Sequence, residues 1–134
     1  MAVFKHFRVY PEAGSKLYFQ VRVFASRRGF QRFYRLPPRT LAFASATRRL
    51  DPNTDRLSPL LGWVGFYKTG VSHETVAHEM VHAALFYLYR KKIKSLAWDE
   101  NHNKLEERIC YIVGTLVSQF YRKANRRKIG RAHV

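Results

Sequence analysis

The sequence lacks the features that direct proteins to oxidising compartments or to membranes. Its 134 residues include a single cysteine, Cys110, so no disulfide can form within the chain. The first residues carry no apolar run of the kind that a secretory signal peptide needs, and no later stretch is apolar over a membrane-spanning length. We therefore expect a cytoplasmic protein that does not contact membranes. Cys110 has apolar neighbours and is expected to be a small buried side chain.

Acidic residues are also scarce. Nine Asp and Glu stand against 25 Lys and Arg, which gives a formal net charge of +16 at pH 7. A protein of this charge attracts phosphate backbones and acidic proteins whatever its fold, so nucleic acid or another polyanion is an expected partner. Aromatic and basic residues alternate over 28–35, where they would either stack on exposed bases or form a strand with one buried face. We prefer the strand.

The five residues 78–82 combine histidine and glutamate in a pattern typical of zinc hydrolases. His78 and His82 are four residues apart, and Glu79 directly follows the first of them. On a helix both imidazoles project from one face about a turn apart, so a tetrahedral Zn²⁺ ion can take a nitrogen from each. Glu79 then stands beside the metal, where it can take a proton from a metal-activated water. The pattern predicts a zinc site with Glu79 as general base.

Two segments have the apolar spacing of helices. The first begins after Ser72, a favourable N-cap residue, and continues past both histidines. Its expected core-facing stripe, which the histidines flank, consists of Ala77, Val81, Ala84, Leu85 and Leu88. The apolar face of the second segment consists of Leu105, Ile109, Ile112, Val113, Leu116, Val117 and Phe120. Both faces are expected to pack against one core.

A catalytic zinc site needs a third protein ligand, and the second helical segment offers acidic candidates. Glu106 and Glu107 lie at its start. Glu107 shares a helical face with Gly114 two turns later, and a glycine there would let the first helix approach closely. Glu106 points nearer to the apolar face. Spacing alone leaves both residues as candidates.

The segment 106–117, with the sequence EERICYIVGTLV, resembles the glutamate helix of thermolysin-type zinc peptidases, the gluzincins. The resemblance covers about half of the chain and implies a zincin-like fold. It also implies the zinc ligands and the catalytic base, which are His78, His82 and Glu107 with Glu79 as base.

The chain departs from the gluzincin pattern in two places. Tyr111 stands where the family has an aspartate that orients a histidine ligand, and a tyrosine hydroxyl is a weaker partner for an imidazole N–H. The sequence after Glu107 is also too short for the helical lobe that supplies transition-state donors in the family. The residue that would stabilise the developing oxyanion is therefore not identified.

Residues 78–86, with the sequence HEMVHAALF, also resemble the SprT-like peptidases, which act on proteins attached to DNA and use a third histidine. His102 is the candidate for that position. Compact metallopeptidases encoded by bacteriophages are similar in size and layout, with a loop after the histidine helix and an acidic pair at the start of the last helix. A phage protein of this kind would act in the cytoplasm of the host cell.

The first half of the chain has the periodicity of a small sheet. Residues 16–25 alternate apolar and polar side chains, 26–29 are expected to turn, and 30–36 to return as a strand. Residues 40–47 suit a strand or a short helix. Residues 62–68 form a strand that we expect at the edge of the cleft, where an extended peptide can add to it. The candidate contact residues, which would otherwise form a central strand, are Trp63, Val64, Gly65, Phe66 and Tyr67.

These observations predict one compact α+β, zincin-like domain over 1–122, followed by a basic, flexible tail over 123–134. A small N-terminal sheet would precede the histidine helix and the glutamate-bearing helix. The expected function is a zinc metallopeptidase whose substrate is a peptide or protein. The alternative is a basic nucleic-acid-binding or inhibitory protein in which the metal only joins two helices.

Overall fold

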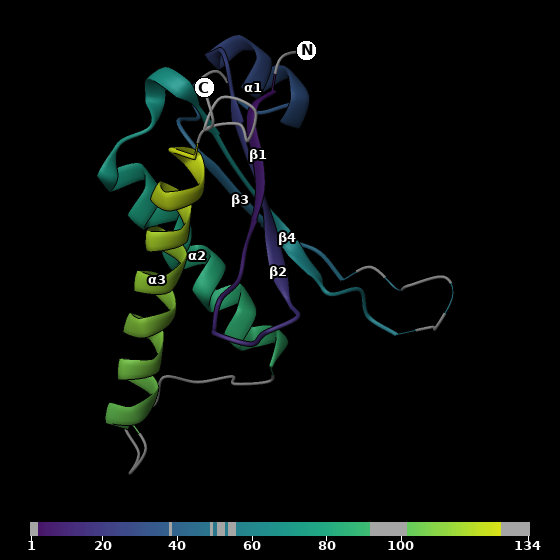
Figure 1. The fold of residues 1–134 in the computed structure, drawn as a ribbon. Coiled ribbons are helices and arrows are strands. Elements are labelled where there is room, and N and C mark those ends of the chain that lie inside the picture. The colour runs from purple at the N-terminus through teal and green to yellow at the C-terminus, as the bar shows by residue number, and fades with distance from the viewer. Residues whose placement is uncertain are drawn as a thin grey trace, which may run out of the picture.

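A four-stranded sheet carries two long helices side by side on one face and a short helix at one end of the other face (Figure 1). The structure, a computed structural model, describes residues 3–37, 39–48, 50, 53, 56–91 and 102–126, without the side chains of 102–104. The elements are β1 (Val3–Val9), β2 (Tyr18–Phe24), α1 (Arg27–Tyr34), β3 (Phe43–Ala46), β4 (Leu60–Tyr67), a 3-10 turn (Lys68–Gly70), α2 (His73–Arg90) and α3 (His102–Ala124). The α+β class predicted from the sequence is confirmed.

The strands lie in the order β1-β2-β4-β3. β1 pairs with β2 and β3 with β4 in antiparallel fashion, whereas β2 and β4 are parallel. β4 is therefore an interior strand, with Val64 paired to Val21 on one side and to Ala44 on the other. The expectation that Trp63, Val64, Gly65, Phe66 and Tyr67 form a substrate edge is wrong, because all five pair with β2 and the first three also pair with β3. The edge beside β4 is β3.

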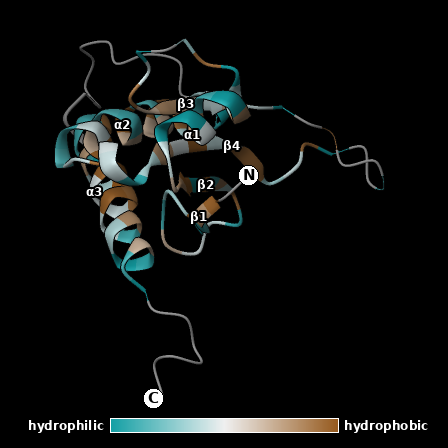
Figure 2. Ribbon diagram, turned by 90° about the horizontal axis from the view of Figure 1, so that it is seen from above, coloured by the Kyte–Doolittle hydropathy of each residue, from teal (hydrophilic) through white to brown (hydrophobic). Residues whose placement is uncertain are grey.

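The main core lies between the sheet and the two long helices. Alternate strand residues such as Phe19, Val21, Val64 and Phe66 point toward α2 and α3 and are fully buried there. Hydrophobic and hydrophilic residues alternate along α3, and hydrophilic residues predominate at the end that leads to the C-terminus (Figure 2). The expected apolar face of α3 is confirmed, since each of its residues is buried in this core or packs against it.

Helix α2 begins as expected, but of its expected core stripe Ala84 and Leu88 are buried and Ala77, Val81 and Leu85 are exposed. The Ser72 hydroxyl accepts a hydrogen bond from the Thr75 N–H and completes a capping box. Val81 and Leu85, expected in the core, are 42% and 41% exposed. Apolar residues extend around most of this helix, so spacing alone allowed two phases. The observed rotation of the helix about its axis places the large side chains of Met80 and Tyr87 in the core. The buried apolar residues of α2 are Val76, Met80, Ala83, Ala84, Tyr87 and Leu88.

The segment expected to turn at 26–29 and return as a strand is instead helix α1. The Ser26 hydroxyl accepts from the Gly29 N–H at the start of the helix, and Arg35 ends it with a left-handed φ of 54°. Phe30 and Tyr34 are four apart, so on a helix both reach the same small core, which they form with Phe24 on the sheet. This cluster lies on the face of the sheet opposite α2 and α3, because Phe24 alternates with Val23 of the main core.

The first strand and the last helix bind each other closely. The Gln119 side chain accepts a hydrogen bond from the Tyr10 N–H at 2.8 Å and donates one to the Tyr10 carbonyl at 2.7 Å. The Lys123 ammonium donates to the Arg8 carbonyl. The strand 3–9 was not expected from the sequence, and Lys123 belongs to α3, not to a tail. The expected tail residues 127–134 lie outside the described residues. No helix in the described part of the chain is long and apolar enough to cross a membrane.

Candidate metal site

The two histidines of the zinc-binding pattern lie together on the outer surface of α2. The ring centroids of His78 and His82 are 5.0 Å apart, and the rings are inclined by 70°. Both residues are exposed, and the His78 side chain is 67% accessible. His82 also stacks on Phe86 one turn later. Two adjacent imidazoles open to solvent fit two positions of a tetrahedral zinc ion.

Glu79 is placed differently from the histidines on either side of it. It is only 8% exposed, and burial raises the pKa of its carboxyl, while the neighbouring His78 and His82 act in the opposite direction. Its Oε2 lies 3.8 Å from the His78 Nε2. A carboxylate in a poorly solvated position beside two imidazoles is more basic than one in water, which suits a general base.

A groove of about 550 Å³ opens beside this part of α2. His78 and Glu79 contribute to one wall, and the segment that leads into β3, residues 39–42, forms the other. Arg39 is the basic member of that second wall. The groove thus joins the histidine helix to the edge strand, a relationship that sequence spacing did not reveal.

The structure does not bring Glu107 to the histidine pair. Helix α3 runs along a different side of α2, where the His73 ring contacts the Tyr121 ring with centroids 5.1 Å apart. His78 faces the groove toward 39–42 instead. Within the described residues no three His, Cys, Asp or Glu side chains lie close enough together to hold a metal ion. The ligand set implied by the gluzincin resemblance is therefore not assembled in this arrangement.

The surroundings of Glu107 show why. Glu106, Glu107, Cys110 and Tyr111 line a separate hollow on the outer side of α3. Tyr111 is 74% exposed, so it orients no histidine. Cys110 is exposed, which corrects the expectation of a buried thiol.

Gly114 does not serve the close approach of α2 that was expected. A side chain there would meet no atom within 4 Å, so the glycine faces open space. The core-facing residues of α3 are Ile112, Leu116 and Phe120, which leaves the Glu107 and Gly114 side turned outward. His102, the candidate from the SprT-like resemblance, begins α3, and its side chain lies outside the described residues.

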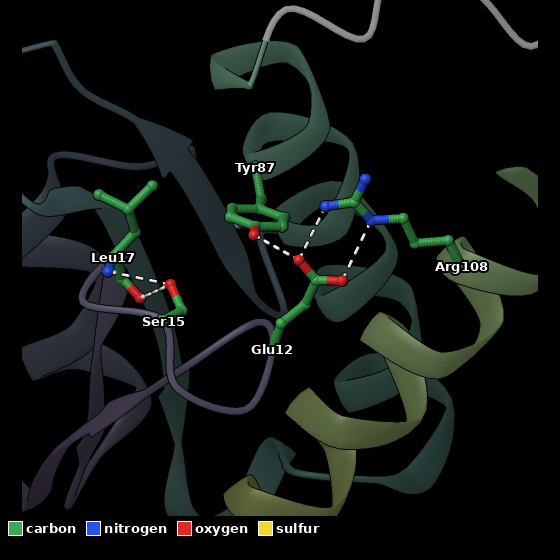
Figure 3. Close-up of polar contacts among 5 residues, drawn as sticks. All are labelled: Glu12, Ser15, Leu17, Tyr87 and Arg108. Atoms are coloured by element: carbon green, nitrogen blue, oxygen red, sulfur yellow. Dashed lines mark hydrogen bonds and ion pairs between the residues drawn. The ribbon is translucent and has the colours of Figure 1, made fainter.

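A polar cluster that the sequence did not indicate joins both helices to the loop after β1. The Glu12 carboxylate accepts hydrogen bonds from the Tyr87 hydroxyl on α2 and from the Arg108 guanidinium on α3 (Figure 3). Tyr87 and Arg108 are 75 and 96 residues from Glu12 in sequence, so no local pattern could relate the three. The cluster links α3 and the loop after β1 to Tyr87, a residue of α2 that does not line the groove.

Comparison of the chain with protein-family models, with curated proteins and with solved structures finds no match.

Proposed function

We propose that the chain is a zinc-dependent peptidase whose site is built on α2. The observation that supports this proposal is the arrangement of residues 78–82. The ring centroids of two exposed imidazoles are 5.0 Å apart, and the glutamate that lies between the two histidines in sequence is buried. A structural histidine pair would not need a desolvated carboxylate at its side. The chemistry of hydrolysis does need one.

His78 and His82 would hold the ion, and zinc bound there would polarise a peptide carbonyl and acidify a water molecule. Glu79 accepts the proton of the attacking water. The same carboxyl then donates that proton to the nitrogen of the leaving amine, which restores the carboxylate. The raised pKa of Glu79 favours both halves of this transfer, because a group with pKa nearer to neutrality gains and loses a proton more readily.

The edge strand β3 gives the proposal a place for substrate. β3 pairs with β4 on one side, and in the described sheet no strand lies on its other side. An extended peptide can bond to such an edge through its main chain. The groove between 39–42 and α2 begins where β3 begins, so a peptide bound there would pass near Glu79. Arg39 in this groove is a candidate donor to the developing oxyanion.

Tight zinc binding calls for a third protein ligand. His102 is the one sequence candidate whose side chain lies outside the described residues, so its substitution belongs in the test.

Zinc titration and cleavage of a casein-type substrate would test the proposal on the purified protein. Glu79→Gln should bind zinc like the wild type and lose cleavage, whereas His82→Ala should lose at least about tenfold in zinc affinity. His73→Ala is the matched control, because His73 lies on the same helix but contacts Tyr121, and it should keep both properties. His102→Ala should weaken zinc binding if this residue is the third ligand. Full cleavage by Glu79→Gln, or unchanged zinc affinity in His82→Ala, would contradict the proposal.

A further inference from the structure

Among the described residues, the face of the sheet opposite the long helices is covered by α1, at one end of that face. Tyr67 and Phe24 pack under α1 there, whereas the rest of this face presents longer polar and aromatic side chains. The strand register places Arg8, Gln20 and Trp63 in one row across three strands. His6 and Arg22 form the next row, and Tyr18 follows Gln20 by two residues along β2. We call these six residues the open sheet face: His6, Arg8, Tyr18, Gln20, Arg22 and Trp63.

Cations and aromatic rings alternate on the open sheet face. The Arg8 guanidinium lies 4.1 Å from the centroid of the Tyr18 ring. The Arg22 guanidinium lies 5.2 Å from the centroid of Phe33, an exposed ring at the rim supplied by α1. Each pair sets a flat apolar surface directly beside a delocalised positive charge.

The charge on this side of the molecule has one sign. β1, β2, β3, β4 and α1 contain no aspartate or glutamate, whereas β1 and β2 place Arg8 and Arg22 on this face and α1 carries Arg27, Arg28 and Arg32. Burial and the charges of Arg22 and Arg8 lower the pKa of His6 on the edge strand β1, which agrees with a positive potential around these arginines. The described acidic residues lie in the loop after β1 and on α2 and α3.

We propose that the open sheet face binds single-stranded nucleic acid. Guanidinium groups pair with phosphates, and aromatic rings stack on bases of any sequence. A flat sheet favours a single strand over a duplex, because only unpaired bases expose a ring to stack. An acidic protein would satisfy the arginines but would leave the rings without a matching partner. The inference goes beyond the proposed peptidase function and is independent of it, since α2 lies on the opposite face.

Fluorescence anisotropy with labelled single-stranded oligonucleotides of DNA and of RNA would test the inference on the full chain. The double variant Arg8→Gln, Arg22→Gln should bind at least tenfold more weakly at about 100 mM salt, and the slope of log affinity against log salt should fall by about 1.4, as expected for two lost phosphate contacts. The matched control is Arg122→Gln, Arg126→Gln, which removes the same charge from the end of α3 and should bind within about threefold of the wild type. Preference for DNA or for RNA would identify the natural ligand.

Stacking has its own test. Tyr18→Leu should weaken single-strand binding by about fivefold or more without changing the salt slope, and its melting temperature would confirm that the fold is intact. Duplexes of the same length, polyglutamate and phosphatidylserine vesicles are the comparison ligands, and each should bind more weakly than single strands. The inference is overturned if the two double variants lose affinity equally. It is also overturned if Tyr18→Leu binds like the wild type, or if duplex, polyglutamate or vesicles bind as well as single strands.

Discussion

Arg108 binds Glu12 with two parallel hydrogen bonds, from Nε to Oε2 at 3.0 Å and from Nη2 to Oε1 at 2.9 Å. The Tyr87 hydroxyl donates to the same carboxylate. Through this one side chain the loop after β1 is linked to both α2 and α3 (Figure 3). The bonds from Arg108 are the main cause that lowers the pKa of Glu12, and the Tyr87 bond adds to them, while burial opposes both.

Replacing Glu12 should therefore destabilise the fold in a pH-dependent way. We expect Glu12→Gln to lower the free energy of unfolding at pH 7 by about 1 kcal/mol, a small value because the pair is partly solvated. A carboxyl whose folded pKa is depressed contributes stability above its unfolded pKa and loses it as pH falls through the folded pKa. Urea unfolding from pH 7 down to pH 3 should show the two proteins converging below about pH 4. A difference that stays constant over this range would contradict the ion pair.

Zinc affinity distinguishes two arrangements of α2 and α3. In the structure Glu107 lies away from His78 and His82, whereas the gluzincin resemblance implies that it is a zinc ligand. Glu107 lies in a hollow on the outer side of α3, and α3 lies along a different side of α2 from the groove. Glu107→Gln should therefore leave zinc affinity within about twofold of the wild type, whereas a lost ligand would cost far more. Isothermal titration with zinc, run beside His82→Ala, checks this. A loss in Glu107→Gln as large as that in His82→Ala would restore Glu107 as a ligand.

The face that α2 turns toward the core predicts that substitutions at two neighbouring residues differ in their effect on stability. Met80 is fully buried and Val81 is 42% exposed. Met80→Ala should cost about 2–5 kcal/mol in unfolding free energy, because it removes core contacts and leaves a cavity. Val81→Ala should change stability by no more than about 0.5 kcal/mol. Denaturant unfolding without metal measures both, and equal losses would argue for the stripe expected from the sequence.

Two glycines provide a matched pair for the sheet. A Cβ at Gly62 in β4 would lie 1.9 Å from the Ser45 carbonyl oxygen of β3, so Gly62→Ala must push the edge strand away. We expect a loss of about 3 kcal/mol or more. Gly114→Ala places a methyl group in open space at an exposed position of α3. Because alanine favours a helix more than glycine does, the change should stabilise the fold by about 1 kcal/mol. Thermal melts of the two variants should shift in opposite directions; a tolerated Gly62→Ala would contradict the pairing of β3 with β4.

The sequence predicted those elements whose signals are local. The Ser72 cap needs only the next three residues, and the face of α3 follows from one apolar stripe on an otherwise polar helix. The adjacency of His78, Glu79 and His82 is fixed by helix geometry alone. Position relative to other elements was harder to predict. The side of α2 on which Glu107 lies depends on contacts between elements far apart in sequence, such as the Glu12 cluster and the core residues of α3.

Helix α1 shows a second limit of local prediction. Phe30, Phe33 and Tyr34 fit the spacing of a strand almost as well as that of a helix over so few residues. The choice depends on Phe24 and Tyr67, which give the aromatic side chains of one helical face a surface to cover. Tertiary packing of this kind overrides a short periodic pattern.

The hydrogen bonds between Tyr10 and Gln119 have a consequence for synthesis on the ribosome. β1 is synthesised before α3, but the Gln119 side chain that bonds the Tyr10 backbone is on α3, the last described helix. Until that helix has emerged, Val9 and Phe19 lack the cover that makes them core residues. Until then the nascent sheet exposes its apolar face, which makes the incomplete chain prone to aggregation.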